Sequence, residues 1–345
     1  MTHPSAQSNN GGTQLGLSLG GAQVSGSDLV ETAVLAERLG YDSIWSSEAW
    51  GQDAFTPLAF VAAATESIGL GTAIAQISAR TPATTAMTAL TLQGLSGGRL
   101  QLGLGVSGPQ VVEGWHGVPF GRPLTKTREY VEVLRLAMAA DRRVEYDGSE
   151  FHIPYLGQGS TGLGKPLRTT IRDVPPAPIL IAAIGPKNVA LAVEVADGVL
   201  PYLWSPSRWD QAWGESLSAA RPGFAVAPTV LVAIDDDIDR ARAAVRPRLA
   251  LHVGGMGARG KNFYHALVTR YGYASEADEI QDRFLSGDRD GANRAVSDAM
   301  VDDLALVGPT RRVAERLSVW RSSPVTTLIA EPHDQHSLEE LARAW

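Results

Sequence analysis

One stretch of this sequence combines bare backbone with groups that can transfer protons. The segment Gly103–Gly108 contains three glycines, and Glu113, Trp115 and His116 follow it closely. Glycine lets a ligand approach the main chain, because it has no Cβ. Carboxylate and imidazole side chains are common general acids and bases. We interpret this stretch as a ligand shelf with proton-transfer groups at its rim, although Trp115 and His116 could equally serve only to pack the segment against the rest of the protein.

The same glycines allow a second interpretation. Gly103-x-Gly105-x-x-Gly108 has the spacing of the dinucleotide-binding fingerprint. That fingerprint needs a helix that begins on the last glycine, so that its free N–H groups meet a phosphate. Pro109 and the run Gly114–Gly117 follow instead, and the pattern predicts no helix before about Leu124. The dinucleotide interpretation is therefore disfavoured.

The elements that must position this stretch alternate between strand and helix. The pattern predicts eight strands, at Gln14–Leu19, Ser43–Ser46, Ile68–Ile74, Leu100–Val106, Pro178–Ala183, Gly198–Tyr202, Ala225–Ala233 and Thr326–Ile329. It predicts intervening helices that include one capped by Ser27 and one opened by Pro82, with Ala86, Met87 and Leu90 facing inward. Such alternation most simply closes into a (β/α)8 TIM barrel, in which ligands bind at the carboxyl ends of the strands. Two segments do not fit the repeat and are read as insertions: Arg142–Pro176, after strand four, and Val253–Val307, before the last strand.

A second candidate ligand site follows the fifth predicted strand. There the strand runs into Ala182 and Ala183, and then Gly185 and Pro186 open a helix whose second residue is Lys187. A helix start offers free N–H groups and a positive dipole end, both of which favour a phosphate. The alternative is an ordinary strand-to-helix turn. A phosphate-bearing ligand that reaches from the strand-four shelf to this helix would explain both loops.

The amino-acid composition excludes several classes of function. The chain has 345 residues, of which 44% are hydrophobic and 19% charged, a net charge of −7 and no cysteine. It therefore has no disulfide, no thiolate nucleophile and no cysteine-bound metal. The negative charge argues against nucleic acid as a partner, and no apolar run is long enough to span a membrane. Residues 1–12 resemble a flexible lead-in and not a signal peptide, so we expect one domain over residues 13–345 and a cytoplasmic location.

Three partial motifs carry little weight. Gly159–Lys165 matches a P-loop, but Pro166 stands where a hydroxyl residue should bind magnesium. Asp235–Asp237 begins like a calcium loop but lacks its later glycine and glutamate, and is better read as a helix cap. His333 and His336 have no cluster of partner ligands nearby in the sequence. We therefore expect no metal.

Several further motifs, taken together, resemble the bacterial luciferase-like superfamily. These are Tyr41–Glu48, Leu70–Ile74, Arg80–Pro82, Leu95–Gly105 and Ile184–Lys187. The run Ser107–Gly117 is similar to the branch that uses the deazaflavin coenzyme F420, which includes methylenetetrahydromethanopterin reductase and many actinobacterial oxidoreductases. The resemblance extends over roughly Gln14 to Ile329.

The resemblance implies a barrel that binds F420 at its carboxyl end and transfers a hydride between the coenzyme's C5 and a small organic substrate. It implies the catalytic residues Glu48, Glu113 and His116, and cofactor-binding residues at Ala73, Ile74, Gln76, Gly105, Val106, Ser107, Gly108, Ala182, Ala183, Gly185, Pro186 and Lys187. The alternatives are an FMN-dependent monooxygenase, since relatives bind FMN on the same barrel, and a non-catalytic flavin-binding barrel.

The resemblance carries three more expectations. A non-proline cis peptide is expected between Ala73 and Ile74, behind the ring. A homodimer is expected through the second and third helices, whose small residues would allow close approach: Ala62, Ala63, Ala83, Ala86 and Ala89. Many relatives carry a histidine directly after the acidic residue of strand two, where this chain has Ala49. His116, with Glu48, therefore becomes the candidate for proton transfer. Glu113 becomes the candidate for orienting a ligand.

Overall fold

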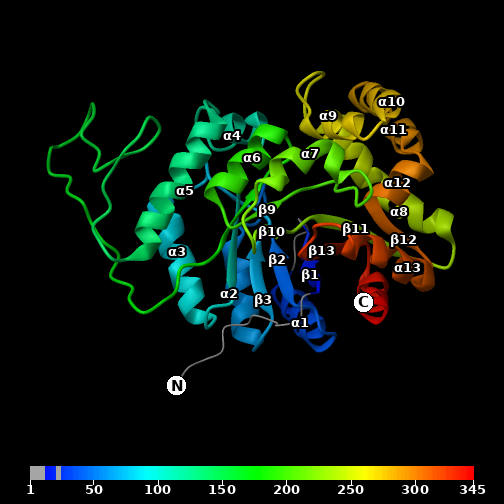
Figure 1. Ribbon diagram of the computed structural model, residues 1–345, viewed down its shortest axis with the longest axis horizontal. Helices are drawn as coiled ribbons and strands as arrows, with labels where there is room; N and C mark the ends of the chain where they lie inside the picture. Colours follow the sequence, from blue (N-terminus) through cyan, green and yellow to red (C-terminus); the bar gives the residue numbers. More distant parts are fainter. Residues whose placement is uncertain (1–11, 21–24) are drawn as a thin grey trace.

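Parallel strands and helices alternate along the chain, as the computed structural model shows for residues 12–20 and 25–345 (Figure 1). Residues 1–11 of the expected lead-in lie outside the described residues. The strands are β1 (Gln14–Ser18), β2 (Ser43–Ser46), β3 (Gly69–Thr72), β4 (Ala75–Gln76), β5 (Leu100–Gly105), β6 (Tyr146–Asp147), β7 (His152–Ile153), β8 (Ile179–Ala182), β9 (Gly198–Leu200), β10 (Ala225–Val226), β11 (Thr229–Ile234), β12 (Ala305–Gly308) and β13 (Thr327–Pro332).

The helices cover the outside of the sheet. They are α1 (Gly26–Arg38), α2 (Phe55–Ala64), α3 (Pro82–Leu95), α4 (Pro109–Gly114), α5 (Pro123–Ala139), α6 (Pro186–Val195), α7 (Trp209–Ser218), α8 (Ile238–Ala250), the π-helix η1 (Leu251–Gly255), α9 (Phe263–Arg270), α10 (Ala274–Leu285), α11 (Arg289–Ala295), α12 (Asp298–Leu304), α13 (Thr310–Arg321) and α14 (Gln335–Ala344). No helix among the described residues is both long enough and apolar enough to cross a membrane.

The parallel sheet closes on itself. β1 pairs with β2 on one side and with β13 on the other, while β10 pairs with β9 and β11 pairs with β13. Only Ala227 and Pro228 separate β10 from β11, so these two strands together occupy the seventh position of a barrel and join its two halves. The predicted (β/α)8 TIM barrel is confirmed.

The inside of the barrel is filled. Five buried apolar side chains pack together there: Trp45, Leu180, Leu200, Ala227 and Ile329. Two glycines make room for them, because a Cβ on Gly71 would lie 2.2 Å from the Trp45 ring and one on Gly103 would lie 2.5 Å from Leu200. Ala73, Ile74 and Ala182 pack on this cluster and are only partly buried.

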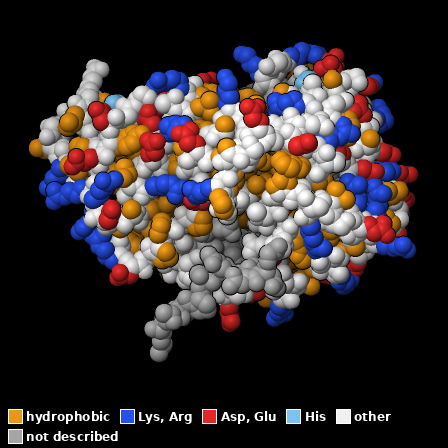
Figure 2. Space-filling model, in the orientation of Figure 1, with side chains coloured by type: hydrophobic (Ala, Val, Ile, Leu, Met, Phe, Trp, Pro, Cys, Tyr) orange, Lys and Arg blue, Asp and Glu red, His pale blue; other side chains and the backbone are white. Residues whose placement is uncertain are grey.

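The two predicted insertions are present. Residues 140–178 leave the barrel after α5, form the antiparallel hairpin β6–β7 and extend away from the body of the molecule (Figure 1). Residues 251–304 form a mainly helical block, η1 to α12, between the seventh strand and β13. Ion pairs between Arg242 of α8 and both Asp298 and Asp302 fix α12, at a surface where basic and acidic side chains lie beside each other (Figure 2).

Some predictions of local structure were wrong. The segment up to Val307 is predicted to be an insertion outside the barrel strands, yet Ala305–Gly308 is the strand β12, which pairs with β11. Because β12 follows α12 directly, no turn residues mark its start in the sequence. The third strand is broken into β3 and β4. Ser25, not Ser27, caps α1, since its Oγ accepts from the amide of Asp28 at 3.2 Å. Met87 was placed inward but is 60% exposed.

Candidate active site

Three strand ends that are far apart in sequence form a small apolar floor at the mouth of the barrel. A Cβ built on Gly105 would lie 3.0 Å from the Ile74 side chain and 3.3 Å from the Ala182 Cβ, so these residues are in direct contact. The peptide between Ala73 and Ile74 is cis, as expected, and lies in the break between β3 and β4. The structure thus brings together the predicted residues of strands three, four and five.

The loop after β5 rises from this floor. Val106, Ser107 and Gly108 are partly exposed, and Ser107 has a φ of 61°, a left-handed conformation that is uncommon outside glycine and often marks a functional site. The prediction that no helix begins before Leu124 was wrong, because α4 opens at Pro109 directly after Gly108. Proline suits the first turn of a helix. A closed barrel nevertheless excludes the open sheet of a dinucleotide-binding fold.

Helix α4 places the two predicted rim residues differently. Glu113 is exposed, and within the described part of the chain its carboxylate accepts one hydrogen bond, from the amide of Phe120 at 3.3 Å. His116 is half-buried, with its Nε2 3.0 Å from Oε1 of Gln76 on β4. Trp115 beside it is 65% exposed. His116 therefore lies against strand three, whereas Glu113 is free to meet a ligand.

The third predicted catalytic residue, Glu48, is fully engaged inside the protein. Its Oε1 accepts from the main-chain amide of Gln76 at 2.6 Å and from Nη1 of Arg80 at 2.5 Å, and its Oε2 accepts from the amide of Ala54 at 3.1 Å. The Glu48 side chain is 6% exposed and that of Arg80 19%. A carboxylate held by three donors is suited to fixing the break between β3 and β4. No local motif indicates this contact, because Arg80 lies one strand further along the chain.

A second carboxylate stabilises the loop after β2. Burial acts to raise the pKa of Asp53, but hydrogen bonds from the hydroxyl and amide of Thr56 and the amide of Phe55, with the charge of Arg80, outweigh it and lower that pKa. Asp53 is therefore ionised at neutral pH and holds the start of α2 beside Arg80.

The predicted phosphate loop lies at the start of α6. Gly185 is the N-cap, no side chain caps the helix there, and a Cβ on Gly185 would meet nothing within 4 Å. Pro186 and Lys187 are exposed. Ala183 is buried in the outer core, and its main-chain amide donates to the carbonyl of Leu200. Open space beside an uncapped helix start fits a phosphate group.

Sequence reasoning missed Arg270 beside this loop. Its Nη2 lies 3.4 Å from the carbonyl of Ile184, which also accepts from Nε1 of Trp213 at 2.7 Å. The Nε of Arg270 is buried without a hydrogen-bond partner, and the ion pairs of the described chain do not include Arg270. Arg270 comes from the second insertion, 86 residues downstream of Ile184, so no local motif could reveal it.

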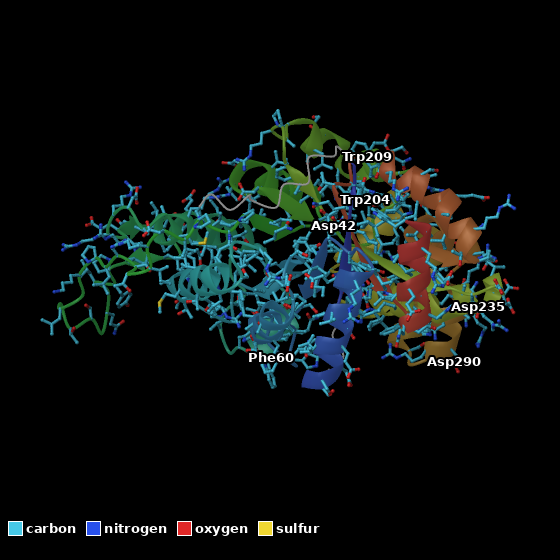
Figure 3. All side chains as sticks on the ribbon, turned by 90° about the horizontal axis from the view of Figure 1, so that it is seen from below. Asp42, Phe60, Trp204, Trp209, Asp235 and Asp290 are labelled. Carbon is cyan, nitrogen blue, oxygen red and sulfur yellow. The ribbon has the colours of Figure 1, made fainter. Side chains whose placement is uncertain are left out.

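Aromatic side chains from the loop after β9 and from the second insertion form a buried cluster. The His252 ring packs 4.5 Å from that of Tyr202 and 4.9 Å from that of Tyr264, while Arg248 pairs with Glu331 at 3.2 Å. Burial lowers the pKa of His252 to about 4. Burial also raises the pKa of Glu331, although the charge of Arg248 opposes it. Trp204 stacks on Trp209, and both are labelled in Figure 3. Trp204 also stacks on Trp213.

His252 should make stability fall at mildly acidic pH. An unfolded histidine has a pKa near 6.5, whereas folded His252 has one of about 4, so below pH 6.5 the unfolded chain takes up a proton that the folded chain refuses. The linkage amounts to roughly 3 kcal/mol lost between pH 6.5 and 4. Urea unfolding at several pH values should show a shallower loss in His252→Phe, whereas the exposed control His336→Gln should follow the wild type. Equal slopes in all three proteins would contradict the prediction.

No group of three His, Asp or Glu side chains in the described part of the chain is arranged to hold a metal ion. His333 and His336 are both exposed.

Comparisons with known proteins agree with this architecture. The model of the luciferase-like monooxygenase family matches residues 6–327. A Mycobacterium tuberculosis protein named as a coenzyme F420-dependent oxidoreductase is 43% identical over 96% of this chain and 98% of its own. The 5,10-methylenetetrahydromethanopterin reductase of Archaeoglobus fulgidus is 29% identical, covering 86% of each chain.

A solved structure shares the fold. The F420-dependent tetrahydromethanopterin reductase of Methanopyrus kandleri superimposes with a TM-score of 0.78 at 22% identity, over 96% of this chain and 98% of that one. The sequence match spans nearly the whole barrel, from before β1 to the start of β13. The chain therefore belongs to the luciferase-like family.

Proposed function

We propose that the protein is a coenzyme F420-dependent oxidoreductase that transfers a hydride between the coenzyme and a small organic substrate. The observation that carries the proposal is the contact of Ile74, Gly105 and Ala182, which gives a flat apolar floor for a planar ring. The start of α6, with Lys187 and Arg270 beside it, offers a place for the acidic tail. The 43% identical relative supports the choice of coenzyme.

We assign separate roles in coenzyme binding, proton transfer and ligand orientation to the residues of the site. The deazaflavin supplies a carbon, C5, that gives or takes a hydride. Ala73, Ile74 and Gly105–Gly108 would hold the ring, and Ala182–Lys187 would hold the phosphate. Gln76, which the resemblance placed among the cofactor-binding residues, is 1% exposed and would act behind His116 without touching the ring. His116 would take up or return a proton, and exposed Glu113 would orient the coenzyme or the substrate.

We propose a positioning role for Glu48 in place of the expected catalytic one. Its carboxylate is held by three donors, so we propose that it positions β4 and, through β4, Gln76.

Titration of the purified protein with F420 and with FMN, followed by absorbance and fluorescence, tests the coenzyme. We expect micromolar binding of F420 and much weaker binding of FMN. The reverse order, with oxygen consumption in the presence of a flavin reductase, would instead support the FMN-dependent monooxygenase, a chemistry that the family's description includes. Tight binding without turnover with any donor or acceptor would support a flavin-binding protein.

Arg270 should contribute to the affinity for the coenzyme's tail. The guanidinium lacks a carboxylate partner among the described residues and lies beside the start of α6, so an anionic group there gains a charged hydrogen bond. Arg270→Met is expected to weaken F420 binding about tenfold or more. The deazaflavin that lacks the phosphate-bearing tail should bind wild type and variant alike. Equal weakening for both compounds would mean that Arg270 acts only on the shape of the loop.

The surface of α2 and α3 supports the expected homodimer. Neither helix contains a charged residue, and Phe60, Met87 and Leu95 are each more than half exposed; Phe60 lies at the outer edge of the helical layer (Figure 3). Large exposed apolar surfaces commonly mark association sites. Ala63 and Ala83 are exposed as the prediction requires, but Ala86 and Ala89 are buried in the protein's own core and are not available to a partner.

We predict that Phe60→Glu combined with Met87→Glu converts a dimer into a monomer. Two charges opposite their copies across a two-fold axis would repel and be desolvated. Light scattering with size-exclusion chromatography measures the mass, and the control Leu163→Glu alters an apolar residue that is 84% exposed on the first insertion. A wild-type monomer at micromolar concentration would remove the prediction.

A further inference from the structure

The orientation of the Gln76 side-chain amide is fixed by its partners. Gln76 is 1% exposed, and its Nε2 donates to the carbonyl of Ala49 at 2.7 Å and to that of Glu48 at 3.2 Å. The opposite orientation would set Oε1 against two carbonyl oxygens, which can only accept. Oε1 therefore faces His116, whose Nε2 lies 3.0 Å away.

This orientation determines which nitrogen of His116 carries the proton. An amide oxygen has no hydrogen to give, so Nε2 must donate. A neutral imidazole has a single N–H, and its second nitrogen is then an acceptor. Nδ1 of His116 is consequently the basic nitrogen, and no hydrogen bond to it occurs among the described residues.

The fixed amide depends in turn on a firmly held strand. The main-chain N–H of Gln76 donates to the buried carboxylate of Glu48, which Arg80 also binds. The carbonyls that receive the side-chain amide belong to Glu48 and Ala49, directly after β2. Gln76 is thus anchored at both ends, and it is stiff enough to set the ring orientation of His116.

We propose that Gln76 is a positioning residue that holds His116 as its Nε2–H tautomer, so that Nδ1 exchanges the proton of the reaction. The proposal rests on the proposed function. In substrate oxidation, the substrate's O–H or N–H bond breaks and its proton goes to the Nδ1 lone pair, giving an imidazolium. The bonding electron pair forms the new double bond to carbon, and the hydride leaves that carbon with its own electron pair for the coenzyme. Substrate reduction reverses each of these movements.

The tautomer can be measured without coenzyme or substrate. Protein labelled with ¹⁵N-histidine, held at mildly alkaline pH so that the ring is neutral, distinguishes a protonated from an unprotonated ring nitrogen by chemical shift. The His116→Gln variant identifies the signals that belong to residue 116. We expect a protonated Nε2 and an unprotonated Nδ1. A protonated Nδ1 would overturn the proposal.

Two substitutions of similar size test the positioning role. Gln76→Met removes the acceptor, so the ring should populate both tautomers, and turnover should fall about tenfold while coenzyme affinity and the Michaelis constant stay within about twofold. In Gln76→Glu, a protonated carboxyl would donate its O–H to the carbonyls that now receive the amide and would keep its other oxygen as the acceptor opposite Nε2. This variant should retain the Nε2–H tautomer and recover most of the turnover lost in the Met variant. Unchanged turnover in Gln76→Met, or a fall explained by coenzyme affinity alone, would overturn the positioning role.

The two proposals fail in different ways. If the wild-type protein does not bind F420, the proposed function fails, and the chemical shifts of His116 still report the tautomer. If Gln76→Met does not fold, as judged by near-UV circular dichroism, the wild-type spectrum and Gln76→Glu decide the outcome.

Discussion

Replacing Glu48 with Ala is expected to lower the free energy of unfolding by about 3–5 kcal/mol, the usual cost of leaving one member of a buried ion pair without its partner. The substitution strands the Arg80 guanidinium and removes the acceptor of two main-chain amides, those of Ala54 and Gln76. Because these donors fix the break between β3 and β4, the floor at Ile74 should also loosen, and affinity for the coenzyme should fall with stability.

Urea unfolding measures the first effect, and Glu66→Ala, an exposed acid just after α2, is the matched control. The double variant Glu48→Gln with Arg80→Met should be less destabilised than the sum of its single changes, because neither charge is then left alone. A loss below about 1 kcal/mol in Glu48→Ala would mean that the ion pair contributes little to stability, as many exposed pairs do.

Replacing His116 with Gln is expected to lower turnover about a hundredfold or more, the usual contribution of general acid–base catalysis. The glutamine amide can still donate to Gln76, so coenzyme affinity and stability should be kept. Steady-state kinetics with F420 and a fluorescence titration separate the two quantities. Unchanged turnover would mean that His116 and Trp115 only pack α4 against β4, and the proton would then come from Glu113 or from solvent.

Glu113 provides the comparison for that experiment. Because its carboxylate is exposed and bound only by one amide, Glu113→Gln should alter the Michaelis constant or the coenzyme affinity more than stability. Similar defects in both variants would argue that the two residues act as one unit.

The sequence predicted the barrel because its strands and helices are separated by clear turn residues. It could not predict β12, which follows α12 with no turn between them, or the helix α4, which begins where a proline and a glycine-rich run indicate a loop. The cis peptide and the place of Ile74 in the floor followed from a resemblance, since nothing in the local pattern at Ala73 and Ile74 distinguishes them.

The site was harder to predict than the fold, for a physical reason. Which polar groups meet depends on how neighbouring strands and insertions are placed in space. Glu48 looked like a free acid at a strand end, yet Arg80 binds it from the loop between β4 and α3. Arg270 comes from an insertion, and only the folded chain brings it to the carbonyl of Ile184. Residue type indicated candidates, and three-dimensional contacts decided their roles.

The packed interior of the barrel determines the order in which the coenzyme and the substrate can bind and leave. Five packed side chains fill the barrel, so no ligand can enter from its amino-terminal end and the site opens only at the carboxyl end: Trp45, Leu180, Leu200, Ala227 and Ile329. A planar ring lying on the floor would then be covered by whatever binds after it. The coenzyme should therefore bind first and leave last, and the substrate should bind second and leave first. An unreactive substrate mimic should trap the coenzyme beneath it.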